Sequence, residues 1–224
     1  MSSLEAGEAI SNGIKKAHKD AEVEIRPLAD GGEGTVEALS IGMGGRLINV
    51  DVTGPAGKSV NAVYGIVDSS KTAIIEMSQA AGITLVSGDE KNPLYTTTFG
   101  VGELIKDAIN KGCRHFVVGI GGSATNDCGI GMLSELGIKF IDEQGQLCRC
   151  GINDLSKIDV IDNKNINSKL TKARFSIISD VSNPLIGKNG ATYIFSKQKG
   201  LDENKFAEVD KYIEKFSKVF IYQY

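Results

Sequence analysis

Three glycine-rich loops carry the residues best suited to bind and activate an anionic substrate. They span residues 29–35 (ADGGEGT), 121–127 (GGSATND) and 179–190 (SDVSNPLIGKNG). Each loop follows a strand-like run and contains both glycine and aspartate. Loops that leave the carboxyl ends of strands in an open α/β sheet gather along one edge, where ligands bind. The sequence therefore predicts one ligand site built from all three loops.

The middle loop has the most specific chemistry. The apolar run from Phe116 to Ile120 breaks into Gly121, Gly122 and Ser123, followed by a small-residue helical pattern. A strand that stops at glycines and restarts as a helix offers backbone N–H groups to an anion. The sequence therefore predicts an anion on the N–H groups of these three residues. Nearby side chains that can donate, orient a hydroxyl or hold a metal are Ser123, Thr125, Asn126 and Asp127.

Two other interpretations of the loops stay open. The first loop, taken alone, is equally well explained as a turn whose acids cap the next helix. Residues 119–124 also fit G-x-G-x-x-A, with Asp142 about twenty residues on, as in NAD-binding units. Against NAD, polar residues 125–127 occupy the first helical turn under the pyrophosphate. A Walker A loop is absent from the sequence, which excludes ATP binding of that kind.

Composition is that of an ordinary globular protein. The chain has 224 residues, 41% hydrophobic and 24% charged, with a net charge of −3 and a pI near 5.5. This balance gives no electrostatic reason to expect nucleic acid or an anionic membrane as a partner. No apolar run approaches the roughly 18 residues of a membrane span, and the first ten residues lack the pattern of a secretory signal. We expect a cytoplasmic protein.

The cysteines are too few and too irregular for a disulfide framework. Cys148 and Cys150 could form half of a metal site, but His18 and His115 are too far away in sequence to complete it. We expect free thiols at all four positions, Cys113, Cys128, Cys148 and Cys150.

The pattern of elements predicts an α/β fold. Helical periodicity is expected over 4–19, from 35 onward, and over 102–110, 129–136 and 203–219; strands are expected over 22–28, 115–121, 139–141 and 174–181. Alternating segments at 46–52, 60–67 and 72–77 predict an antiparallel meander. The interpretation is a mostly parallel Rossmann-like sheet with helices and an inserted lobe. The expected parts are 1–45, the meander lobe 46–97, and the strand–helix units 98–224 with their Gly-rich ligand loops.

Five long motifs, in order over nearly the whole chain, resemble those of the bacterial glycerate kinase family. They are ADGGEGTVEAL (29–39), VTGPAGK (52–58), KNPLYTTTFGVGELI (91–105), GIGGSATNDCGIGML (119–133) and DVSNPLIGKNGA with FSKQKG (180–200). The resemblance implies phosphorylation of D-glycerate by ATP, typically at the 2-hydroxyl, with Mg²⁺.

Compared with that family, the chain is expected to be trimmed at both ends, lacking an N-terminal strand and a C-terminal region. The alternative to an active kinase is therefore a folded fragment that turns nothing over. A missing strand leaves an open sheet edge, so we expect homo-oligomeric association.

Phosphoryl transfer needs charge neutralisation, positioning and a carboxylate that accepts the hydroxyl proton or holds Mg²⁺. Under the resemblance, Asp127 or Asp180 accepts the proton, and Asp180 is the expected metal ligand. Asn126 and Asn183 are expected to orient the reactants and Lys199 to contact a phosphate. The choice of base among Asp30, Asp127 and Asp180 stays open. The other residues expected at this edge are Gly31, Gly32, Glu33, Gly121, Gly122 and Ser123.

Overall fold

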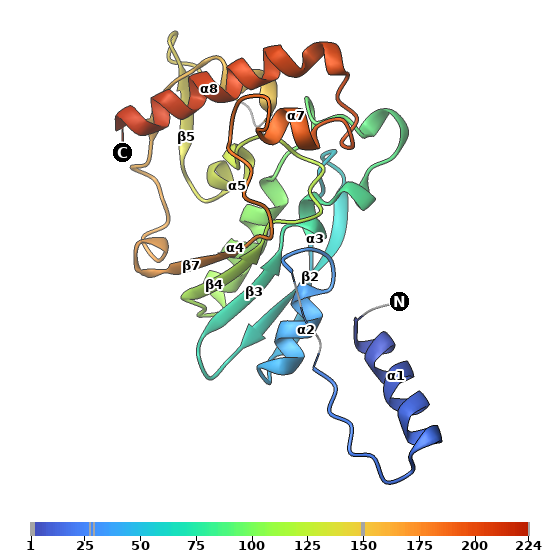
Figure 1. Cartoon of the computed structure of the whole chain (residues 1–224). Helices are drawn as coiled ribbons and strands as arrows, with labels where there is room; N and C mark the ends of the chain where they lie inside the picture. The colour runs from blue at the N-terminus through green and yellow to red at the C-terminus, as the bar shows by residue number, and fades with distance from the viewer. Residues whose placement is uncertain (1–2, 27, 29, 149–150, 224) are drawn as a thin grey trace.

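A five-stranded mixed sheet forms the centre of the protein (Figure 1). The computed structural model describes residues 3–26, 28, 30–148 and 151–223. The order β1-β2-β3-β4-β7 combines two antiparallel ladders, β1 with β2 and β2 with β3, and two parallel ladders, β3 with β4 and β4 with β7. The strands are β1 (Arg46–Thr53), β2 (Ser59–Val67), β3 (Thr72–Glu76), β4 (His115–Gly119) and β7 (Arg174–Ile178).

The expected α/β class is confirmed, with parallel strands beside an antiparallel meander. The meander belongs to the same sheet as the parallel strands, because β3 pairs with β2 on one side and with β4 on the other. The division at residues 45/46 and 97/98 stays a prediction.

Helices cover both faces of the sheet, and the period of two in the strands decides which residue meets which helix. On one face, Ala73 and Ile75 of β3 join the core formed with α4 (Phe99–Asn110). On the other face, Ile74 packs with Val36 of α2 (Thr35–Gly42). Every residue of β3 is buried, as expected for a strand covered on both sides.

A smaller unit lies beyond the carboxyl ends of the parallel strands. β5 (Lys139–Asp142) and β6 (Ile158–Asp162) form an antiparallel pair that packs with α8 (Phe206–Gln223). The predicted apolar face of the last helix is confirmed, since Val209, Ile213 and Phe216 are buried in this core. The remaining helices are α3 (Ser78–Ala81), α5 (Ile130–Glu135), α6 (Ile152–Leu155) and α7 (Ala191–Phe195), with short 3₁₀ turns at Ile83–Leu85, Gly88–Glu90, Leu170–Lys172 and Glu203–Lys205.

The position of β5 decides against the NAD interpretation. A dinucleotide-binding unit needs the strand before Asp142 to join the parallel sheet that holds β4. Instead β5 pairs with β6 in a separate sheet, and the Asp142 carboxylate accepts hydrogen bonds from the N–H groups of Gln144 and Gln146. Asp142 caps a turn and is not placed to hold a ribose.

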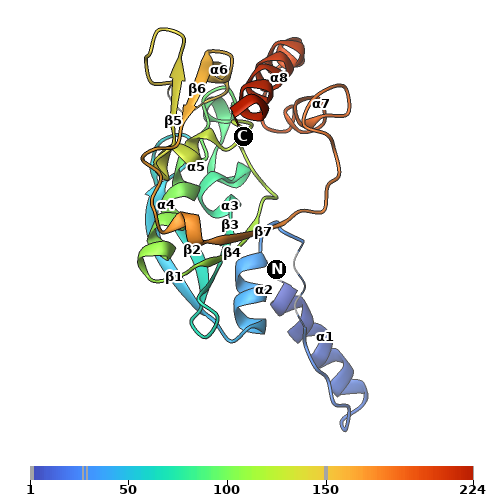
Figure 2. The same ribbon diagram turned by 90° about the vertical axis from the view of Figure 1, so that its left-hand side faces the viewer.

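The expected strand at 22–28 is wrong for the described residues of that range. Residues 22–26 and 28 have no regular structure, and Pro27 lies outside the described residues. Val23 and Ile25 alternate as in a strand, but a strand needs a neighbour to complete its ladder, and no described residue pairs with this segment. The segment follows α1 (Ser3–Ala17), which projects away from the sheet in Figures 1 and 2.

Candidate functional site

The three glycine-rich loops meet at the carboxyl edge of the parallel strands. The N–H of Gly121 donates to the Gly31 carbonyl at 3.0 Å, and the N–H of Ile120 donates to the Ile178 carbonyl at 3.3 Å. Gly31 has a φ of +96°, and a Cβ there would lie 2.5 Å from the Ile178 oxygen. Only glycine allows this approach. The first loop is thus locked between the loops that follow β4 and β7.

This packing corrects one expected role. The Gly121 N–H holds the first loop, so it is not available to an anion. In the part of the chain that the structure describes, the N–H groups of Gly122 and Ser123 have no hydrogen-bond partner. The backbone N–H groups that remain available on this loop are therefore those of Gly122 and Ser123. Gly122 has a φ of +69°, which turns the chain at this point.

A pocket of about 470 Å³ opens beside these N–H groups. Asp180 lies on its lining from the loop after β7 and is exposed. Among the described residues the Asp180 carboxylate has no hydrogen-bond or salt-bridge partner. The described residues that line the pocket are Ile83, Ile120, Gly121, Gly122, Ser123, Ser179, Asp180, Val181, Phe195, Gln198 and Lys199.

Lys199 brings a buried positive charge to the pocket. The backbone of Lys199 lies in a tight turn, in which its N–H donates to the Ser196 carbonyl and the following Gly200 has a φ of +91°. The Lys199 Nζ donates to the Thr125 carbonyl at 2.6 Å and to the Ser123 Oγ at 2.9 Å. Burial lowers the pKa of Lys199 to about 8, because the charged form is poorly solvated there. No carboxylate lies within salt-bridge distance of this ammonium in the described part of the chain.

Asp127 has a different environment from Asp180. It is 1% exposed, and its carboxylate accepts hydrogen bonds from Thr98, Gly129 and Gly131. Thr98 contributes both its N–H, at 3.0 Å, and its hydroxyl, at 2.8 Å. Burial raises the pKa of Asp127, while these donors act in the opposite direction. The carboxylate ties the start of α4 to the start of α5 by accepting four hydrogen bonds, three on Oδ2 and one on Oδ1.

The two asparagines orient parts of the protein. The Asn126 amide donates to the hydroxyls of Thr192 and Ser196, both at 3.2 Å, and so holds α7 against the middle loop. The Asn183 amide donates to the Asn189 carbonyl at 3.0 Å within its own loop. Asn183 does not line any of the pockets described here.

Asp30 and Glu33 line a neighbouring pocket of about 790 Å³ beside α2. The Asp30 carboxylate caps its own turn by accepting from the Gly32 N–H at 2.9 Å. Glu76, at the end of β3, also lines this pocket; it is 1% exposed and accepts from the Val36 N–H. Sequence reasoning missed Glu76. The sequence does show an acidic residue directly after the apolar run of residues 73–75, at the end of a predicted strand.

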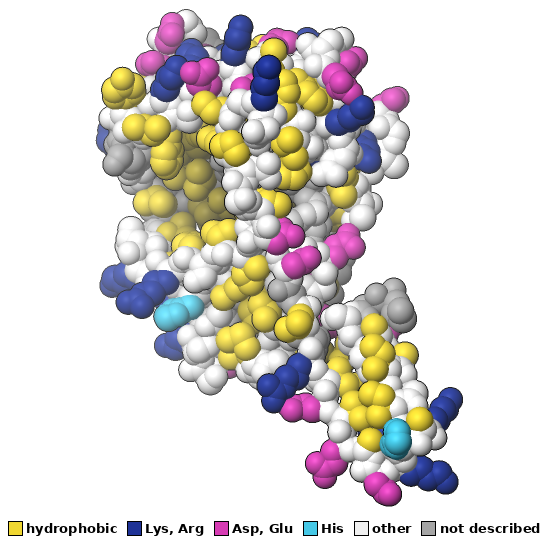
Figure 3. Space-filling model, viewed as in Figure 1, with side chains coloured by type: hydrophobic (Ala, Val, Ile, Leu, Met, Phe, Trp, Pro, Cys, Tyr) yellow, Lys and Arg dark blue, Asp and Glu magenta, His cyan; other side chains and the backbone are white. Residues whose placement is uncertain are grey.

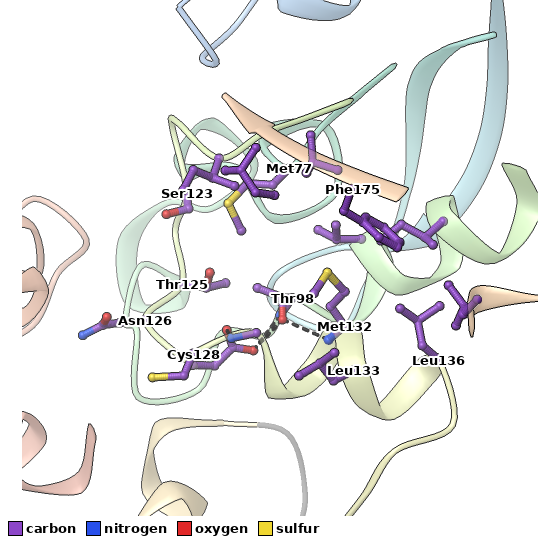
Figure 4. Close-up of a pocket in the computed structure, with 18 of the residues that line it drawn as sticks. Met77, Thr98, Ser123, Thr125, Asn126, Cys128, Met132, Leu133, Leu136 and Phe175 are labelled. Carbon is purple, nitrogen blue, oxygen red and sulfur yellow. Dashed lines mark hydrogen bonds between the residues drawn. The ribbon is translucent and has the colours of Figure 1, made fainter. Parts of the chain in front are cut away.

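A third pocket, of about 580 Å³, is mainly apolar and lies between β7 and helices α4 and α5. In Figure 4, Ser123 and Thr125 lie on one wall, Leu136 and Phe175 lie on the opposite side, and Asn126 points away. Figure 3 shows a hollow lined by hydrophobic side chains on this face of the molecule. Ser123 and Lys199 line both this pocket and the pocket of Asp180. The Ser123–Lys199 pair therefore lies where the two pockets adjoin.

Among the described residues, no group of three or more His, Cys, Asp or Glu side chains is placed to hold a metal ion. Cys113, Cys128 and Cys148 are free cysteines, and Arg149 and Cys150 lie outside the described residues. None of the described helices is both long and apolar enough to cross a membrane.

The chain is thus an α/β protein whose glycine-rich loops, buried lysine and exposed aspartate lie together at the carboxyl edge of its parallel strands. A sequence model of the glycerate kinase family matches residues 1–223. The chain belongs to the glycerate kinase family.

Individual relatives agree with this assignment. The chain is 42% identical to "Glycerate kinase" of Bacillus cereus over 98% of its length, and 41% identical to "Glycerate 2-kinase" of Escherichia coli, also over 98%. It covers 58% of each of these relatives. A crystal structure assigned as glycerate kinase 2 from Salmonella typhimurium LT2 superimposes with a TM-score of 0.89 at 40% identity, covering 98% of this chain and 59% of that one. The chain thus spans less than two thirds of the length of the relatives it matches.

Proposed function

We propose that the chain binds D-glycerate and ATP and transfers the γ-phosphoryl group to the 2-hydroxyl, giving 2-phosphoglycerate. The observation that carries the proposal is the pocket in which Lys199, Ser123 and Asp180 meet. A buried cation without a carboxylate partner suits an anionic ligand, since buried charges in proteins are normally paired. Family membership supports glycerate and ATP as the reactants.

Within this pocket, Asp180 accepts the proton of the attacking hydroxyl or holds the metal. The Asp180 carboxylate is exposed and has no hydrogen-bond partner within the described structure, whereas the buried Asp127 carboxylate already accepts four hydrogen bonds. We therefore assign the catalytic role to Asp180 and give Asp127, the sequence-based alternative, the role of holding the loop. The N–H groups of Gly122 and Ser123 bind the negative charge, and the Lys199 ammonium behind Ser123 adds a positive charge to this side of the pocket.

The donor set at Asp180 fits Mg²⁺. Magnesium in phosphoryl-transfer sites is commonly bound by one or two carboxylates together with substrate phosphates and waters. Asp180 supplies one such carboxylate. When bound, the ion neutralises phosphate charge. Asp30 and Glu33 lie in the adjoining loop, and we propose that they contribute to the same edge of the cleft, with Asn183 ordering the third loop.

A second candidate is a folded chain that binds these ligands without turnover. It is favoured by the chain's coverage of only 58% of its relatives, because further residues of those proteins could complete the cleft. We also propose cytoplasmic activity and self-association, the latter because β7 pairs only with β4 within the described structure.

The test is an assay of ADP release by this chain with D-glycerate, ATP and Mg²⁺, with glycerate and Mg²⁺ omitted in turn. Phosphorus NMR of the product distinguishes 2-phosphoglycerate from 3-phosphoglycerate. We expect glycerate-dependent ADP release that Asp180→Asn abolishes. Asp159→Asn is the matched control, because Asp159 is exposed on β6 and outside the pockets. No ADP release from folded protein would reject catalysis by this chain and favour the second candidate.

A further inference from the structure

We propose that Lys199 acts through Ser123: Lys199 fixes the Ser123 oxygen as an acceptor, so that the Ser123 hydroxyl proton is directed to an anionic oxygen in the adjoining pocket. The inference concerns the ligand site of the proposed function and rests on it for the identity of the ligand. Lys199 is then a positioning residue, and Ser123 is the contact to the ligand.

The chemistry of the two side chains sets the direction of the hydrogen bond between Lys199 and Ser123. An ammonium has three donors and no acceptor, whereas a hydroxyl has one donor and two acceptor sites. At 2.9 Å the Lys199 Nζ therefore donates to the Ser123 Oγ when the lysine is charged. The Ser123 proton is left to find another acceptor, and the described residues provide none.

Lys199 is held rigidly in place. Lys199 is 9% exposed, and its Nζ makes a second bond to the Thr125 carbonyl at 2.6 Å. The following Gly200 is fixed closely against the Lys91 carbonyl, because a Cβ on this glycine would lie 1.8 Å from that oxygen. Lys199 is thus fixed both at its Nζ, by two hydrogen bonds, and at its backbone, by the closely packed turn that follows.

The described residues around Ser123 and Lys199 leave the positive charge of the lysine without a direct partner of opposite charge. Within the described structure Lys199 has no salt-bridge partner. Burial lowers the pKa of Lys199 and the Asp127 charge partly offsets this, but the Asp127 oxygens accept hydrogen bonds from Thr98, Gly129 and Gly131. The N–H groups of Gly122 and Ser123 lie on the same loop and are unpaired within the described structure. Two amides, a directed hydroxyl and a positive charge behind it match a carboxylate or a phosphate oxygen.

The experiment measures binding by amide NMR of the isotope-labelled chain, following Gly122 and Ser123. Inorganic phosphate, D-glycerate and a non-hydrolysable ATP analogue serve as separate probes, so that a carboxylate and a phosphate source are distinguished. The variants are Lys199→Met, Ser123→Ala, their combination and Ser123→Thr. Lys197→Met is the matched control, because Lys197 is an exposed lysine two residues away that pairs with Glu203.

We expect each of Lys199→Met and Ser123→Ala to weaken binding about tenfold or more, a loss of about 1.4 kcal/mol, because charge-assisted hydrogen bonds are stronger than neutral ones. The double variant should bind no more than about threefold more weakly than the weaker single variant. Ser123→Thr keeps the hydroxyl and should restore most of the affinity, a rescue that a merely structural role would not give. Lys197→Met should bind like the wild type.

Multiplying losses in the double variant would mean two independent contacts and would overturn the proposal. Wild-type affinity in both single variants, or no binding of any probe to the wild type, would also overturn it. Binding with this pattern but without ADP release would uphold the Ser123–Lys199 unit and reject the proposed catalysis. Glycerate-dependent turnover that is unchanged in both single variants would uphold the proposed catalysis and reject the Ser123–Lys199 unit.

Discussion

Replacing Asp127 by alanine should unfold part of the site before it affects any chemistry. The carboxylate is 1% exposed and accepts hydrogen bonds from two donors of Thr98 and from the N–H groups of Gly129 and Gly131. These bonds fix the start of α4 against the start of α5, where positive helix ends favour a negative charge. Asp127→Ala removes every one of them.

The size of the effect follows from the donors left behind. An unsatisfied buried donor costs about 1–3 kcal/mol, and a charged acceptor makes each lost bond more costly. The desolvation cost of the buried carboxylate is recovered at the same time, in agreement with the raised pKa of Asp127. The loss in the free energy of unfolding should therefore be about 3–5 kcal/mol, as for one partner removed from a buried charged network.

Urea unfolding followed by far-UV circular dichroism measures this loss, read from the transition midpoint at unchanged slope. Asp127→Asn keeps one acceptor oxygen and should lose less than Asp127→Ala. Asp159→Ala is the exposed control and should stay within about 0.5 kcal/mol of the wild type. If Asp127→Ala were as stable as the wild type but bound no anion or metal, the structural assignment of Asp127 would be refuted and its catalytic assignment restored.

Three further outcomes are expected. Gly100→Ala should destabilise the protein by about 1–3 kcal/mol in urea unfolding, because the added Cβ would lie 2.0 Å from the Thr53 carbonyl oxygen. Gly13→Ala is the control and should not destabilise the protein, because nothing lies within 4 Å of the added Cβ. Equal losses in the two variants would contradict the packing argument. The unfolded chain keeps the Lys199 proton up to about pH 10.5 while the folded chain releases it near pH 8, so stability should rise between these values by roughly 3 kcal/mol in total. Urea midpoints at several pH values should show this excess rise in the wild type over Lys199→Met, and parallel curves would contradict it. Tyr64→Phe should lower the free energy of unfolding by about 1 kcal/mol, because it removes the 2.6 Å hydrogen bond that the buried Tyr64 hydroxyl donates to the Asp107 carboxylate. A melting curve identical to that of the wild type would refute this contribution.

Local pattern was enough to predict most of the helices and strands and the sheet edge at which the three glycine-rich loops meet. Alternation in 72–77 and an apolar run in 115–121 specify strands, because side chains on opposite faces of a strand meet different surroundings. The glycine-rich loops at the ends of β4 and β7 could be assigned to one edge, because parallel strands carry their carboxyl ends together. Val209, Ile213 and Phe216 likewise show the helical spacing that their burial confirms.

Partners distant in sequence decided the rest. Glu22–Arg26 has the alternation of a strand, but alternation does not supply a ladder partner, and none of the described residues pairs with it. β5 has an ordinary strand sequence, and its pairing with β6 rather than β4 removed the NAD interpretation.

The chemistry of the loops depended on the same kind of contact. From the sequence, Gly121 and Gly122 offer equivalent N–H groups, and Asp127 and Asp180 offer equivalent carboxylates. In the structure, the Gly31 carbonyl occupies the first N–H, and donors from Thr98, Gly129 and Gly131 occupy the carboxylate of Asp127. The sequence by itself determined which groups could bind an anion or a proton. The tertiary structure decided which of them remain available, because a hydrogen-bonding group that is filled by another part of the chain has little left to offer a ligand.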